Sequence, residues 1–138
     1  MVIVDDKQKK LATNLIQQYV NGWKANRIEL IIDNLHDNCV VIESHGPMYS
    51  GITDIKKWFD SWLVAKGVVT KWDILSYYYA EDHVVFFEWD FSCTVHNKQY
   101  ALPGMTLVKF AEQKIILLHE YRMKCHAYSW NQQQLVSE

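Results

Sequence analysis

The sequence predicts an α+β fold in which N-terminal helices pack on a strongly curved, mostly antiparallel sheet. Apolar residues recur at helical spacing before residue 66, whereas long strand-like segments separated by short polar turns occupy residues 68–126. Strands of that length must twist and bend, and a bent sheet covered on one side by helices encloses a space. We therefore expect a cone-shaped domain with a pocket between its helices and its sheet.

The first two helices are indicated by periodicity and by capping residues. A helix from about Lys7 to Lys24 can be capped by Asp5 or Asp6, and its apolar residues form one buried face. A second, shorter helix is expected to begin at Asn26, because Glu29 follows three residues later as in a capping box. A turn is then expected at 37–38.

A first strand is expected at Cys39–Glu43, followed by a loop at 45–51 with a short strand at 48–49. Thr53 is expected to cap a third helix, Asp54–Lys66, and Gly67 to end it in the left-handed conformation.

Four long strands are expected to complete the sheet, at Val68–Ala80, Val84–Val95, Tyr100–Phe110 and Lys114–His126. Gly104, next to a proline, is predicted to form a bulge or bend that helps the sheet to curve. The turn between the first two of these strands is expected at 81–83.

Composition excludes several classes of protein. The net charge of −2 and the scattered Lys and Arg residues do not form the basic stripe that nucleic-acid binding requires. The apolar runs are too short to span a bilayer, and the polar first ten residues do not resemble a secretion signal. Three cysteines without a CxxC motif favour reduced thiols in a cytoplasmic protein. We expect no metal and no cofactor, because the six His lack metal-ligand spacing and the five Gly form no phosphate loop.

Aromatic residues are abundant, with six Trp, eight Tyr and five Phe in 138 residues. They offer more flat, partly polar surface than a minimal core needs, and such side chains favour pockets that hold a ligand. The partner we expect is therefore a small hydrophobic molecule.

The order of the predicted elements resembles the nuclear transport factor 2-like superfamily. The segments that carry the resemblance are Gln18–Asn21, Asp37–Glu43, Gly51 with Trp58-Phe59, Phe87–Phe91, and Leu107–Phe110 with Lys114-Ile115 and Glu120-Tyr121. Within the superfamily the chain is most similar to the SnoaL-like group, which includes polyketide cyclases. The resemblance implies a cystatin-like cone over residues 1–127 with a tail at 128–138. It also implies a homodimer through the outer sheet face, where alternation places Glu88 and Asp90.

The resemblance brings three enzyme templates, and none matches fully. Ketosteroid isomerase combines a Tyr, a carboxylate base and a protonated Asp; here Tyr19 matches, Ser44 occupies the base position, and Thr106 stands near the Asp position. SnoaL-type cyclases place an acid after a Tyr on the last strand, but Tyr121 is followed by Arg122. Epoxide hydrolases of the limonene type use an Asp–Arg–Asp relay. Residues of suitable type exist in this sequence, but those on the 84–95 strand face outward.

Several residues are nevertheless candidates for chemistry. His45, beside Glu43 at the expected pocket mouth, is a candidate base, and Tyr19 a candidate donor. Glu43 and Glu120 are candidates to assist them, although the sequence leaves open which face of the last strand, and hence whether Glu120, points inward. Expected ligand contacts are Trp58, Trp62, Trp89, Thr106, Tyr121 and Arg122.

Two hypotheses remain open. One is a pocket protein that binds a hydrophobic small molecule, and the other is an enzyme that uses His45 and Tyr19 for proton transfer or hydration.

Overall fold

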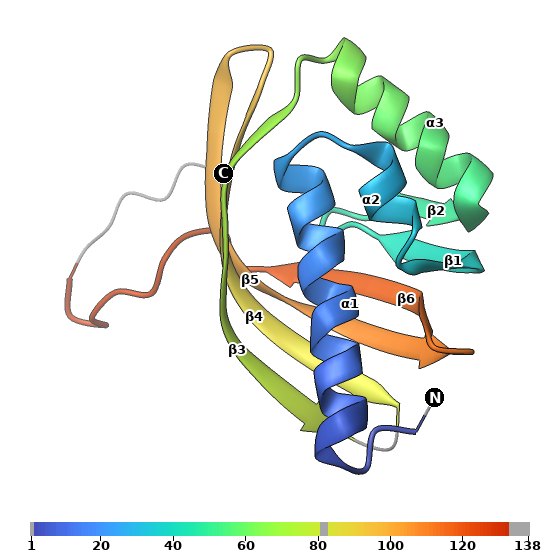
Figure 1. The fold of residues 1–138 in the computed structure, drawn as a ribbon. Coiled ribbons are helices and arrows are strands. Elements are labelled where there is room, and N and C mark those ends of the chain that lie inside the picture. The colour runs from blue at the N-terminus through green and yellow to red at the C-terminus, as the bar shows by residue number, and fades with distance from the viewer. Residues whose placement is uncertain (1, 81–82, 133–138) are drawn as a thin grey trace.

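The computed structural model describes residues 2–80 and 83–132 (Figure 1). Its elements, in chain order, are α1 (Asp6–Lys24), α2 (Ile28–Ile32), β1 (Leu35–Ile42), β2 (Met48–Ser50), α3 (Gly51–Val64), β3 (Val68–Ala80), β4 (Val84–Val95), β5 (Lys98–Ala111) and β6 (Lys114–Arg122). The predicted succession of helices and strands is confirmed.

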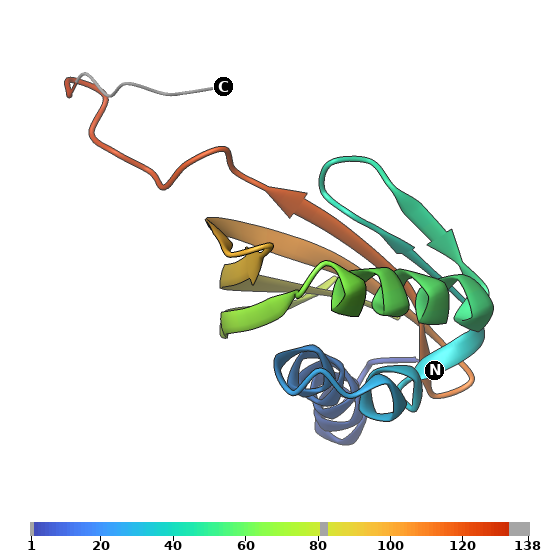
Figure 2. The ribbon, with the colours of Figure 1, turned by 90° about the horizontal axis from the view of Figure 1, so that it is seen from above.

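Six strands form one sheet in the order β2-β1-β6-β5-β4-β3. Neighbouring strands are antiparallel except β1 and β6, which run parallel with Val41 opposite Leu118. The helices all lie on one side of the curved sheet, and the segment after β6 leaves on the other side (Figure 2). The expected α+β architecture is therefore confirmed, with an open sheet.

The core lies between α1 and the concave face of the sheet. Alternate residues of β4 supply its centre, because Val85, Phe87 and Trp89 are buried while the residues between them are partly exposed. Ile16 and Val20 of α1 pack against this face and are fully buried. Burial of this apolar area is the main force that holds the helices on the sheet.

The start of α1 is confirmed, whereas that of α2 is corrected. The Asp5 side chain accepts a hydrogen bond from the Gln8 amide at 3.0 Å, as a helix cap does. Asn26 does not cap α2: the N-cap is Arg27, without a side-chain bond. Asn26 instead adopts a φ of 52°. Its side-chain amide accepts a hydrogen bond from the Trp62 indole and donates one to the Gly67 carbonyl.

The expected turn at 37–38 is part of β1, which begins at Leu35 and is irregular in its pairing with β6. Thr53 lies inside α3 and is not its cap. The helix begins at Gly51 after the N-cap Ser50, whose amide donates to the Asp54 carboxylate at 3.0 Å. This carboxylate, three residues into the helix, satisfies the free amide, so Thr53 is not needed there.

Two glycines serve close packing and not the conformations that we expected. The left-handed residue after α3 is Lys66, with a φ of 57°, whereas a Cβ on Gly67 would lie 2.1 Å from the Trp62 ring. Pairing at Gly104 is regular on both sides, and its missing side chain makes room for the Trp89 indole. Curvature therefore does not require a bulge at this position.

Strand boundaries also differ at the C-terminal end. β6 ends at Arg122, four residues before the expected His126. Part of the expected turn at 81–83 and part of the expected tail lie outside the described residues.

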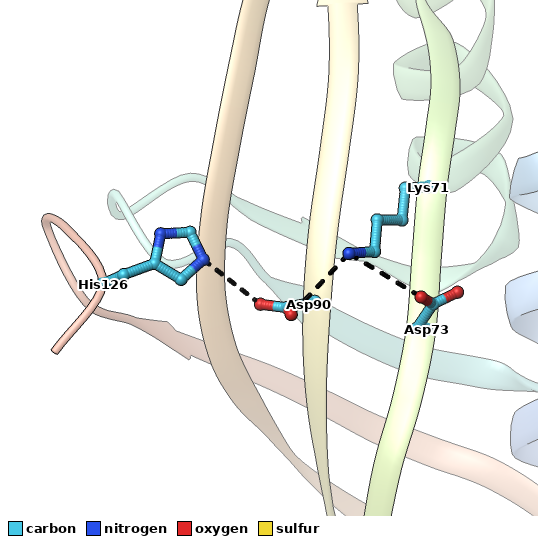
Figure 3. Close-up of polar contacts among 4 residues, drawn as sticks. All are labelled: Lys71, Asp73, Asp90 and His126. Atoms are coloured by element: carbon cyan, nitrogen blue, oxygen red, sulfur yellow. Dashed lines mark ion pairs between the residues drawn. The ribbon is translucent and has the colours of Figure 1, made fainter.

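The outer face of the sheet carries a small charged cluster near the C-terminal segment (Figure 3). Lys71 Nζ lies 3.8 Å from carboxylate oxygens of both Asp73 and Asp90, and His126 Nε2 lies 3.4 Å from the other Asp90 oxygen. The predicted outward position of Asp90 is therefore confirmed. Exposed ion pairs of this kind contribute little to stability, about 0–1 kcal/mol each.

Candidate functional site

A cavity of about 530 Å³ opens between the concave face of the sheet and helices α1 and α3. Its lining side chains come from α1, α3, β3, β4, β5, β6 and the segment that directly follows β1. Its size falls in the range of small-molecule sites in proteins, roughly 300–1,000 Å³.

Aromatic rings form about half of the cavity wall, eight of its seventeen lining residues. The rings that line it are those of Tyr19, Trp23, Trp58, Trp62, Trp72, Trp89, Phe91 and Tyr100. Neighbouring rings stand at large angles to one another, 87° between Trp23 and Trp62 and 83° between Trp72 and Trp89. The walls therefore resemble a box of upright rings and not a single stack.

Hydrogen bonds fix the orientation of some of these rings. The Trp62 indole donates to Asn26 Oδ1 and the Trp89 indole to Thr106 Oγ1, each at 2.8 Å. The buried Trp72 indole N–H has no acceptor among the described residues. Within residues 2–80 and 83–132, this N–H group in the cavity wall is therefore a buried donor without a hydrogen-bond acceptor.

Glu43, directly after β1, is held by a tyrosine from the neighbouring strand. Tyr49 Oη donates a 2.6 Å hydrogen bond to Glu43 Oε1, and its ring stacks on Trp58 at 4.2 Å. The Glu43 carboxylate and burial raise the pKa of Tyr49, so the phenol remains a donor, with burial the larger cause. On the other side, His45 Nδ1 lies 4.0 Å from Glu43 Oε2, with the His45 side chain 56% exposed.

Glu120 lies beside Glu43 because of the parallel pairing of β1 and β6. The register places Ile42 opposite His119, so the next residues of the two strands, Glu43 and Glu120, are neighbours that both line the cavity. The inward face of β6 is thus the one with Leu118, Glu120 and Arg122, which settles the alternation that the sequence left open.

Enclosure in the wall changes the chemistry of Glu120. Burial raises the pKa of its carboxyl to about 8, and the neighbouring Glu43 carboxylate adds to the rise. Among the described residues, Glu43 is the charged side chain that shifts this pKa. Glu120 is therefore largely protonated at neutral pH and can both donate and, at slightly higher pH, accept a proton.

Tyr19 of α1 lines the same cavity and is buried. Burial, followed by Glu120, raises the pKa of its phenol well above the ordinary value, so Tyr19 remains neutral and able to donate. Burial likewise raises the pKa of Cys93, with a smaller contribution from Glu43, so this thiol in the wall stays protonated at neutral pH.

The structure brings most of the predicted site residues to one cavity. The predicted residues that line the cavity are Tyr19, Glu43, His45, Glu120, Trp58, Trp62, Trp89 and Arg122. Two of the expected ligand contacts do not. Thr106 is buried behind the wall, where it accepts the Trp89 bond, and Tyr121 is 52% exposed with its hydroxyl at His119 Nδ1. Both placements follow from strand alternation, since Glu120 points inward and its neighbour Tyr121 outward.

Sequence reasoning missed some of the wall. Trp23 was expected only on the buried face of the first helix, and Tyr100 only as the beginning of a strand. The alternation of Tyr100 and Leu102 with their neighbours on β5 is the pattern that indicates this face. Tyr49 carried no signal, because its bond to Glu43 depends on the pairing of β1 with β2.

Within residues 2–80 and 83–132, no group of three or more His, Cys, Asp or Glu side chains is placed to hold a metal ion. Over the same ranges, no helix has both the length and the apolar character needed to cross a bilayer.

A family model for the SnoaL-like domain matches residues 16–118, a range that includes Glu43 and ends before Glu120. The chain belongs to the SnoaL-like domain family. No curated protein matches the sequence. The family name therefore describes the fold and leaves the chemistry of this SnoaL-like protein to be argued from its site.

Solved structures resemble this SnoaL-like protein in fold. They include an epoxide hydrolase of the LEH type from M. tuberculosis, with TM-score 0.72, 11% identity and coverage of 83% of this chain and 84% of that one. A candidate polyketide cyclase from Xanthomonas campestris pv. campestris has a TM-score of 0.68 and 15% identity. The match covers 81% of this chain and 90% of that one. A protein with a ketosteroid isomerase-like fold from Catenulispora acidiphila, solved in complex with trimethylamine, has a TM-score of 0.66 and 14% identity. The match covers 78% of this chain and 83% of that one.

The raised pKa of Glu120 predicts a pH-dependent stability. Between pH 4.5 and 8 the folded protein keeps a proton on Glu120 that the unfolded chain releases, so the free energy of unfolding falls as pH rises through this range. Glu120→Gln removes this term, which is at most about 1.4 kcal/mol per pH unit. Urea unfolding at pH 5, 6.5 and 8 measures the difference. Glu29→Gln, on exposed α2, is the control of equal charge, and equal pH slopes for all three proteins would contradict the prediction.

Proposed function

We propose that this SnoaL-like protein binds a small, largely hydrophobic molecule in the aromatic cavity, with the polar end of the molecule at Glu43 and Glu120. One observation carries the proposal: a cavity of about 530 Å³, lined by eight aromatic rings, has two neighbouring carboxyl groups in its wall. Aromatic walls supply affinity by excluding water, while a few polar groups fix orientation. The bound trimethylamine in the Catenulispora acidiphila protein supports the view that this fold can enclose a small molecule.

Binding in the cavity predicts that a side chain which fills it will block a ligand. In Cys93→Phe the added ring projects from β4 into the cavity, whereas in Ser92→Phe it projects from the outer face of the same strand. The neutral fluorophore N-phenyl-1-naphthylamine reports binding by its rise in emission. We expect Cys93→Phe to weaken binding by at least about tenfold, equivalent to about 1.4 kcal/mol. Circular dichroism checks that both variants fold, and equal affinities in folded variants would exclude the cavity as the binding site.

Proton transfer on the bound molecule is the second candidate function. The observation that favours it is the pairing of Glu43, which accepts the Tyr49 bond, with Glu120, which changes its protonation state near pH 8. Such a pair can remove a proton from a substrate at one carboxylate and return it from the other. Tyr19 and His45 then have supporting roles as a neutral donor and as an exposed group at the cavity mouth.

A generic carbon acid tests this second function. In 5-nitrobenzisoxazole a base takes the C3 proton, the C–H electrons form the nitrile, and the N–O bond breaks to give a coloured phenolate. We expect a rate about a hundredfold above that of buffer, rising with pH to a plateau above 8 because the base is ionised Glu120. Glu120→Gln should lose this rate and Glu29→Gln should keep it. An unchanged rate in Glu120→Gln would remove Glu120 as the base.

We further propose a cytoplasmic homodimer formed through the outer face of the sheet. Strand register aligns an apolar row across this face, with Tyr78 opposite Phe86, Phe86 opposite Leu107, and Leu107 opposite His119, which lies next to Ile42. A second copy of the same face would cover these side chains. The cysteines at 39, 93 and 125 are unpaired, in keeping with a reducing compartment.

If the apolar row forms the dimer interface, a charged side chain introduced into it should convert the dimer to a monomer. Wild type should elute with twice the chain mass of 16.3 kDa in light scattering, and Leu107→Glu should give the monomer because it buries a charge in the interface. Thr53→Glu, on the exposed surface of α3, is the control. A wild-type monomer at tens of micromolar would count against the dimer.

A further inference from the structure

We infer that the ligand of the cavity is an organic ammonium cation, held by the ionised carboxylates of Glu120 and Glu43 and by the faces of the surrounding aromatic rings. The inference rests on the proposed function, because it names the chemical class of molecule that the same cavity takes. The inference goes beyond the proposed function because a hydrophobic pocket alone would accept neutral molecules as well as cations.

The first support is the juxtaposition of two acids. Parallel pairing of β1 and β6 makes Glu43 and Glu120 neighbours inside one wall. Among the described residues Glu120 takes part in no ion pair, and Glu43 lies 4.0 Å from the imidazole of the more exposed His45. Two adjacent carboxyl groups in an enclosed space cannot both ionise cheaply without a positive charge between them. A bound cation supplies that charge and allows Glu120 to ionise, whereas with a neutral ligand Glu120 keeps its proton.

The second support is the arrangement of the rings. Trp23 stands at 73° to Tyr19 and at 87° to Trp62, and Trp72 stands at 83° to Trp89 and at 86° to Phe91. Rings set at such angles around one volume direct faces and edges to it from several directions. Ring faces carry the negative part of the aromatic quadrupole, which attracts quaternary and protonated amines. Apolar walls of leucine or valine would exclude water as well but would not stabilise a cation.

The remaining titratable and charged groups of the wall are compatible with a cation. They come from α1, the segment after β1, β4, β5 and β6, and are Tyr19, His45, Cys93, Tyr100 and Arg122. The phenol of Tyr19 and the thiol of Cys93 stay neutral at physiological pH, because burial raises their pKa values. Arg122 ends β6 with an exposed side chain, so solvent screens it, and it does not lower the pKa of Glu120. Tyr49, which bonds Glu43, is likewise neutral, since its pKa is raised.

The proton balance of binding follows. At neutral pH the empty site holds a proton on Glu120, and a permanent cation can pair with this carboxyl only after the proton leaves to solvent. An amine that enters uncharged instead takes the proton from Glu120 and becomes the ammonium ion. In both cases the bound state contains one ammonium charge beside the ionised Glu120.

Two molecules of the same shape test the inference. In 4-(trimethylammonio)benzyl alcohol a nitrogen cation replaces the central carbon of the tert-butyl group in 4-tert-butylbenzyl alcohol, and neither molecule titrates in the relevant range. Calorimetry at pH 8 should show the cation binding at least about tenfold more tightly than its neutral isostere. The cation's affinity should fall by roughly tenfold per pH unit below pH 8, with nearly one proton released per molecule bound. The neutral molecule should show neither effect.

Variants separate the possible outcomes. Glu120→Gln, which keeps the shape of the protonated acid, should lose both the preference for the cation and most of the pH dependence, while Glu29→Gln should keep both. Equal affinity for the two molecules, or a pH dependence retained in Glu120→Gln, would overturn the inference. If N-phenyl-1-naphthylamine still binds, the proposed function stands without it. If none of the three molecules binds, both the inference and the proposed function fail.

Discussion

The chemistry of the cavity depends on one constraint: Glu120 is buried in a wall that it shares with a second acidic side chain, Glu43. The constraint arises from topology. β1 and β6 are the one parallel pair in the sheet, and their register sets Glu43 beside Glu120 although the residues are far apart in the chain. Burial removes water that would otherwise solvate the Glu120 carboxylate, and the Glu43 carboxylate nearby adds to the effect. The result is an acid that holds its proton near neutral pH.

The helices support this site through specific contacts as well as through general burial. Trp58 of α3 stacks on Tyr49, and Tyr49 in turn holds Glu43. Asn26 between α1 and α2 fixes Trp62 over Gly67, so a residue outside the cavity orients a ring of its wall. Each of these contacts joins the helical layer to one side of the cavity, so the polar and aromatic parts of the site are positioned together.

The sequence predicted the fold because the periodicities are strong and the strands long. It predicted the site in part, since Tyr19, Glu43, His45 and Glu120 were candidates from their types and order, and they line one cavity. Pairing register was not accessible in this way. Strand pairing determines that Glu43 and Glu120 are adjacent, which face of β6 points inward, and that Tyr49 bonds to Glu43. Local capping rules failed at Asn26 and Thr53, because tertiary bonds to Asn26 and the Asp54 carboxylate replaced the expected caps.

Similarity in fold does not decide among the functions of this family, so the protonation state of Glu120 is the property to measure most directly. Selective ¹³C labelling of glutamate side chains, with Glu120→Gln for assignment, allows the carboxyl carbon of Glu120 to be titrated by NMR. If Glu120 is buried beside Glu43 as described, its midpoint in the ligand-free protein lies near 8. A midpoint near the ordinary glutamate value of about 4.3 would mean that water reaches this carboxyl freely, and would contradict an enclosed acid pair.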